Sequence, residues 1–111
     1  MIEAPKPLDW YALSVRTQYE KAVQRNLNAK GYETFLPLTK RRRRKLDRTT
    51  EVEVPLFQGY LLVRLDPQYR LPVLKIPAVD YIVSIDRCPC PIPEEEVETV
   101  RSVVSSTLQY A

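Results

Sequence analysis

Residues 10–16 read WYALSVR, and their alternation predicts the strand on which the fold is built. Tyr11, Leu13 and Val15 share one face of an extended chain, because successive side chains of a strand point to opposite sides. Trp10 lies on the other face with the small and polar residues of the segment. The first face is expected to pack against a core, which leaves the second face as a candidate for function.

A helix is expected directly after this strand. Thr17 and Glu20 have the spacing of a capping box, which predicts a helix from about Gln18. Apolar residues then recur every four positions, and Gly31 supplies the left-handed residue that commonly follows the end of a helix.

The remaining elements complete the order β-α-β-β-α-β-α. Residues 32–39 and 49–65 are expected to be strands joined through a basic segment, residues 67–77 form at most a short helix, and residues 79–85 alternate as a last strand. Residues 94–109 combine an apolar stripe with glutamates at the N-terminal end, which predicts a final helix. This order predicts an α+β fold, with helices packed on a mostly antiparallel four-stranded sheet.

The composition fits one globular domain. The chain has 111 residues, of which 44% are hydrophobic and 28% are charged, and domains usually contain ~100 to 150 residues. Residues 1–9 are expected to be an N-terminal tail and residues 10–111 the domain. No apolar run reaches the ~18 residues of a membrane span and the N-terminus does not resemble a signal peptide, so a cytoplasmic protein is expected. We also expect it to be a monomer.

The residue types present disfavour catalysis and metal binding. The chain contains no His, which removes the commonest general base and the usual zinc ligand. Cys88 and Cys90 supply two thiols where a structural zinc site needs about four ligands, so we interpret them as reduced loop cysteines. We therefore expect neither an enzyme nor a bound cofactor or metal.

Positive charge is concentrated in residues 40–48, KRRRRKLDR. The segment holds seven cations and one acid, whereas the whole chain has a net charge of +3. Arg41, Arg42, Arg43 and Arg44 are candidate nucleic-acid contacts, because such clusters can neutralise phosphates. The alternative is that the run is the solvated tip of a loop between two strands. The segment contains no aromatic residue, so base stacking is not expected there.

The second face of the sheet is the other candidate surface. Trp10 is placed on it, and so are Tyr60 and Leu62 if their strand pairs in the matching register, with Phe57 just before them. Exposed clusters of aromatic and aliphatic residues often mark protein interfaces. The alternative is that the proline-rich segment or the last helix covers this face.

Four segments resemble, in the same order, the N-terminal domain of NusG-like transcription factors. They are Trp10-Tyr11 with the helix after it, residues 56–63 (LFQGYLLV), residues 73–79 (VLKIPAV) and residues 91–97 (PIPEEEV). These segments are similar to the WY start of that family, its FFPGYVLV block, the segment before its last strand and its PIPxxEI helix start. Their spacing resembles the specialised paralogues, which serve particular operons, as much as general NusG.

The resemblance implies a domain that binds RNA polymerase across the DNA cleft and changes pausing and termination without catalysing a reaction. A hydrophobic depression would dock on the clamp helices of the largest subunit, lined by Trp10, Ser14, Phe57, Gln58, Tyr60 and Leu62. The side toward the second-largest subunit would carry Tyr69, Arg70, Leu71 and Pro72. The side toward the displaced non-template DNA strand would carry Arg16, Asn26 and Lys30. The family normally continues into a β-barrel domain with a KOW motif. We expect this chain to be a fragment that stops before that domain, and the alternative is a protein that lacks the domain.

Some features depart from the resemblance or favour another class. Gln58 stands where the family usually has Pro, and Ala78 stands where Gly is common. Residues 58–65 also partly fit a single-stranded RNA-binding module of the RRM type, although Leu62 stands where its stacking platform needs a second aromatic ring. A ferredoxin-like enzyme has no paired catalytic groups in its favour.

Overall fold

A four-stranded antiparallel sheet forms the centre of the computed structural model, which describes residues 8–109. Its strands lie in the order β2-β5-β1-β6. They are β1 (Trp10–Val15), β2 (Thr34–Phe35), β5 (Tyr60–Arg64) and β6 (Val79–Ile82). The predicted α+β class and four-stranded sheet are confirmed. Most of the expected N-terminal tail lies outside the described residues.

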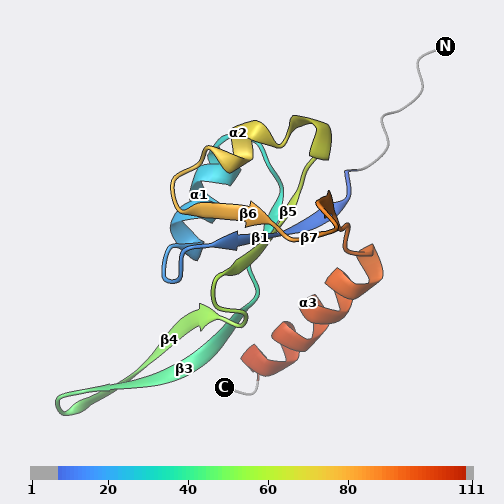
Figure 1. The fold of residues 1–111 in the computed structure, drawn as a ribbon. Coiled ribbons are helices and arrows are strands. Elements are labelled where there is room, and N and C mark those ends of the chain that lie inside the picture. The colour runs from blue at the N-terminus through green and yellow to red at the C-terminus, as the bar shows by residue number, and fades with distance from the viewer. Residues whose placement is uncertain (1–7, 110–111) are drawn as a thin grey trace.

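Helices cover both faces of this sheet (Figure 1). Helices α1 (Glu20–Ala29) and α2 (Leu71–Leu74) lie on one side, and α3 (Glu94–Gln109) lies on the other. A 3-10 turn, η1 (Pro67–Tyr69), leads into α2. The short helix within residues 67–77 and the long final helix are therefore both confirmed.

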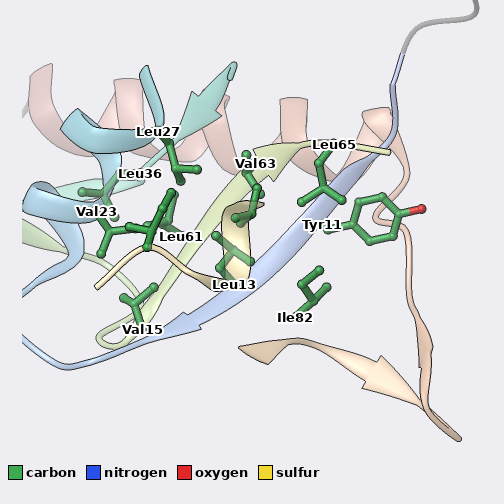
Figure 2. Close-up of a cluster of buried hydrophobic side chains, with 12 residues drawn as sticks. Tyr11, Leu13, Val15, Val23, Leu27, Leu36, Leu61, Val63, Leu65 and Ile82 are labelled. Carbon is green, nitrogen blue, oxygen red and sulfur yellow. The ribbon is translucent and has the colours of Figure 1, made fainter. Parts of the chain in front are cut away.

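The hydrophobic core lies between the sheet and α1 with α2. Tyr11, Leu13 and Val15 of β1 are at most 5% exposed and pack in one cluster with Val23 and Leu27 of α1. Figure 2 shows the β1 side chains beside those of β5 in the same layer. Burying an aliphatic side chain of this kind stabilises a fold by about 1.5–3 kcal/mol. The predicted inward face of β1 is thus the core face.

Helix α1 begins at Glu20 rather than at about Gln18. Gln18 has a φ of 77°, which an α-helix does not allow, and the N-cap residue Tyr19 makes no capping hydrogen bond through its side chain. The carboxylate of Glu20 instead accepts a hydrogen bond from the backbone amide of Gly59 at 2.8 Å. The predicted capping box is wrong because Glu20 makes a tertiary contact.

The basic segment lies in a long hairpin rather than in a loop. Strands β3 (Leu38–Lys45) and β4 (Arg48–Pro55) pair antiparallel along their whole length and form a sheet of their own. Figure 1 shows this hairpin projecting from the body of the molecule, and residues 38–55 are called the arm below. The two long strands expected at residues 32–39 and 49–65 are each divided into two.

Prolines lie at the points where these expected strands divide. Pro37 separates β2 from the arm, and its carbonyl accepts a hydrogen bond from the amide of Leu56 at 2.8 Å, just beyond Pro55. A proline has no amide hydrogen to continue a ladder, so regular pairing stops there. The strand expected at residues 79–85 is also interrupted, because β6 ends before a small hairpin of β7 (Ser84–Ile85) and β8 (Cys88–Pro89).

Candidate functional site

One end of the second sheet face is covered by the segment that begins α3. Trp10 is only 1% exposed, and its carbonyl accepts a hydrogen bond from the amide of Ile92 at 2.8 Å. Of the two alternatives for this face, cover by the segment before the last helix holds at Trp10, so the Trp10 ring does not line an open depression. Alternation along the strand placed Trp10 on the correct face, but only the tertiary structure shows which part of that face the last helix covers.

A polar cluster fixes the start of α3 to the sheet. The carboxylate of Glu94 accepts hydrogen bonds from Arg64 Nη2 at 2.6 and 2.8 Å and from Trp10 Nε1 at 3.1 Å. The guanidinium of Arg64 lies 4.5 Å from the centre of the Trp10 ring and pairs with Glu33 at 2.9 Å. We name Trp10, Arg64 and Glu94 the α3 anchor cluster. Neither Arg64 nor Glu94 was predicted from the sequence to be part of the site.

The other end of the same face is open and carries aromatic rings. Ser14 of β1 lies in register with Tyr60 of β5 on one side and with Tyr81 of β6 on the other. Tyr60 is 41% exposed and Tyr81 is 53% exposed, whereas Ser14 between them is 9% exposed. Phe57, in the turn before β5, is 50% exposed. These four residues are called the aromatic surface below.

Tyr81 is the member of this surface that was not predicted from the sequence. Its strand alternates, so Tyr81 and Ile82 must face opposite ways. Ile82 is 6% exposed and lies in register with Leu13, a core residue, which turns Tyr81 to the outer face. The alternation alone could have separated Tyr81 from Ile82, but the pairing of β6 with β1 was needed to place Tyr81 beside Ser14.

A tight turn holds Phe57 and Tyr60 in place. Gly59 has a φ of 82°, its amide donates to the buried carboxylate of Glu20, and its carbonyl accepts from the amide of Val15 at 2.8 Å. A Cβ atom at Gly59 would lie 3.4 Å from the carbonyl oxygen of Val15, so the turn packs closely on β1. The rings of the aromatic surface are therefore carried by a braced turn and two paired strands.

Leu62 and Gln58 were also predicted to line the depression, and both lie next to the aromatic surface rather than within it. Leu62 is half-buried and lies in register with Phe35 of β2, whose ring stacks under the guanidinium of Arg101 from α3 at 4.4 Å. Gln58 is exposed on the turn beside Phe57. The structure thus brings Ser14, Phe57, Gln58 and Tyr60 together at the open end of the sheet.

The other predicted contacts lie on three separate surfaces. Tyr69 and Leu71 are 70% and 64% exposed, and they lie with the exposed Arg70 and Pro72 around the start of α2. The residues assigned to the non-template strand lie before or on α1: Arg16 and Lys30 are exposed, and Asn26 is half-buried. Arg41, Arg42, Arg43 and Arg44 are exposed on the arm.

Among the described residues, the Tyr11 phenol has a shifted pKa. Burial raises the pKa of the Tyr11 phenol, and the negative charges of Asp9 and Asp66 raise it further. Within residues 8–109, no group of three or more His, Cys, Asp and Glu residues is placed to hold a metal ion. No helix in this part of the chain is long and apolar enough to cross a membrane.

Comparison with known protein families identifies the fold. A family model described as transcription termination factor nusG matches residues 8–101. The chain belongs to the NusG family. Members of this family are transcription factors rather than enzymes and work with RNA polymerase. A search of curated proteins found no match. The range matched to the NusG family includes the whole sheet, the arm, the aromatic surface and the α3 anchor cluster.

Proposed function

We propose that this NusG-family chain binds RNA polymerase through its aromatic surface and changes pausing and termination by bridging the DNA cleft. The observation that carries the proposal is the row of Tyr60, Ser14 and Tyr81, with Phe57 beside it, on an otherwise covered sheet face. Tyr, Trp and Phe are enriched in the central contacts of protein interfaces because they bury a large area at a small entropic cost. Rings on a rigid sheet need little ordering on binding.

The proposed partner of the aromatic surface is the pair of clamp helices of the largest subunit. A helical hairpin presents apolar side chains that can pack against Phe57, Tyr60 and Tyr81. The second-largest subunit is the proposed partner of Tyr69, Arg70, Leu71 and Pro72, and the non-template strand that of Arg16, Asn26 and Lys30. Both assignments rest on the resemblance of this chain to the family, and they imply a protein that works in the cytoplasm.

Single-stranded RNA is the second candidate partner. Tyr60 and Tyr81 are two exposed rings on one sheet face, and base stacking on such rings contributes about 1–3 kcal/mol per base. Against this reading, α3 starts over the same face at Trp10 and leaves little open sheet on which further bases could spread. We therefore favour a protein partner.

Alanine variants of the three rings test this proposal. We expect Phe57→Ala, Tyr60→Ala and Tyr81→Ala each to weaken binding to purified core polymerase by about tenfold or more, because truncated interface anchors cost about 2 kcal/mol. Ile85→Ala is the control, since Ile85 is 65% exposed on the β7–β8 hairpin, and it should change affinity less than twofold. Circular dichroism should be unchanged in all four variants.

A triple ring variant decides between the candidates. Loss of polymerase binding with an unchanged melting temperature supports the proposal, whereas full retention of binding refutes it. The same proteins are titrated with a labelled single-stranded RNA. If wild type binds this RNA tightly but not polymerase, and the triple variant loses RNA binding, then the second candidate is correct.

A further inference from the structure

The two faces of the arm differ in charge. Directly opposite residues of an antiparallel pair share a face, and alternate residues along each strand return to it. One face carries Arg41 opposite Val52 and Arg43 opposite Thr50, and it continues to Arg48 on β4. These arginines are exposed, and we name Arg41, Arg43 and Arg48 the basic face.

The opposite face carries balanced charge. Lys40 lies opposite Glu53 and Arg42 lies opposite Glu51, with Arg44 farther along. Lys40 Nζ also lies 3.9 Å from a carboxylate oxygen of Glu51, which is a diagonal pair on the same face. In contrast, no ion pair involves Arg41, Arg43 or Arg48 among the described residues.

Like charges along one face destabilise a hairpin through mutual repulsion, so the basic face is stabilised by any polyanion that binds it. A guanidinium holds a phosphate through two parallel hydrogen bonds, and three of them on one side form a line of such sites. The other side of the arm lacks this property, because Glu51 and Glu53 offset its cations. The arm is therefore a ribbon with one side suited to phosphates.

The dimensions of the arm fit double-stranded DNA. A strand rises about 3.4 Å per residue, so Arg41 and Arg43 stand about 7 Å apart along the ribbon. Phosphates recur at regular intervals along each backbone that borders the groove, so a line of evenly spaced arginines can meet a line of phosphates. The major groove of B-DNA is about 12 Å wide and admits a two-stranded ribbon, whereas that of A-form RNA is too narrow.

We propose that the basic face of the arm binds the phosphate backbone of duplex DNA, with the ribbon lying along the major groove. The absence of aromatic residues from residues 40–48 disfavours a single strand, which would be held by stacking. The basic face and the aromatic surface have no residue in common, because Arg41, Arg43 and Arg48 belong to β3 and β4, so the two contacts can be tested by separate variants. The basic face would anchor the protein to DNA while another surface contacts the polymerase.

Two double variants with the same loss of charge test the proposal without polymerase. Arg41→Ser with Arg43→Ser removes two residues of the basic face, and Arg42→Ser with Arg44→Ser removes two from the opposite face. Binding to a labelled 20-base-pair duplex is followed by fluorescence anisotropy between 50 and 200 mM salt. Each phosphate contact adds about 0.9 to the slope of log affinity against log salt, so wild type with three contacts should lose about 40-fold in affinity over this range.

The expected result is a difference between the two faces. The Arg41/Arg43 variant should bind more weakly and lose only about fourfold in affinity over the same salt range, since one contact remains. The Arg42/Arg44 variant should keep nearly the wild-type salt dependence. Single-stranded DNA and double-stranded RNA of equal length should bind more weakly than duplex DNA.

Three outcomes would overturn the proposal. They are no binding of wild type to duplex DNA at 50 mM salt, equal effects of the two double variants, and equal or tighter binding of single-stranded DNA or double-stranded RNA. Thermal melts show that the variants are folded, and the exposed positions make unfolding unexpected. The triple ring variant should bind duplex DNA like wild type, so failure here is distinguishable from failure of the polymerase proposal.

Discussion

Glu94→Ala is expected to release the start of α3 from the sheet. Glu94 accepts hydrogen bonds from Arg64 and from the indole of Trp10, so the substitution breaks both contacts at once. Trp10 is 1% exposed and its Nε1 has no other hydrogen-bond acceptor among the described residues. Arg64 keeps its pair with Glu33 at 2.9 Å, so its charge is not left alone.

The loss in stability follows from these contacts. A buried donor left without an acceptor costs about 1–3 kcal/mol. The side chain of Glu94 is 52% exposed, so the ion pair with Arg64 is screened by water and adds only about 0.5–1 kcal/mol. We expect Glu94→Ala to lower the free energy of unfolding by about 1.5–4 kcal/mol.

Urea unfolding followed by tryptophan fluorescence measures this loss directly, because Trp10 is the single tryptophan of the chain and is part of the cluster. Glu95→Ala is the control: Glu95 lies in the same first turn of α3 but is exposed, so it should cost only the dipole contribution of about 0.3–1 kcal/mol. Equal losses of unfolding free energy in the two variants would refute the idea that the α3 anchor cluster holds the start of α3 on the sheet.

The other two predictions concern the turn beneath the rings and the pH dependence of stability. Glu20→Ala should lower the free energy of unfolding in urea by about 1–3 kcal/mol, because the amide of Gly59 loses its buried acceptor, and Glu20→Gln should cost clearly less; equal losses would contradict this. Because the pKa of Tyr11 is raised above 10.0, the unfolded phenol ionises first, so stability should be unaffected by this group below about pH 10 and fall as the pH rises further. Tyr11→Phe should remove that part of the alkaline loss, and an unchanged pH profile between about pH 8 and 11 would count against the assignment.

The parts of the fold that local patterns determine were predictable from the sequence. The alternation of residues 10–16 identified the inner face of β1, and the stripe behind the glutamates identified α3. The arm was not predicted as a hairpin, because residues 40–45 of β3 are all cations and show no alternation, although residues 51–54 of β4 alternate between Glu and Val. In the structure, the two eight-residue strands of the arm are held in place by pairing with each other along their whole length.

The candidate site was predictable only where strand register could be guessed. Tyr60 and Ser14 were placed on the right face, and Tyr81 was missed because its neighbours depend on the pairing of β6 with β1. Trp10 shows the limit most clearly, since residues at the other end of the chain cover it. Trp10→Ala would therefore act mainly through stability, at about 3–5 kcal/mol for a buried aromatic ring, and is a poor probe of partner binding.

The arm and the body of the molecule tolerate substitutions to different degrees. Residues 40–44 and 46–51 are exposed, so replacing them requires no repacking of the interior. The body must preserve a well-filled interior, whereas the hairpin can exchange its exposed residues without disturbing that interior. The charge of the arm can therefore change through a few codons, without first compensating for a weakened fold.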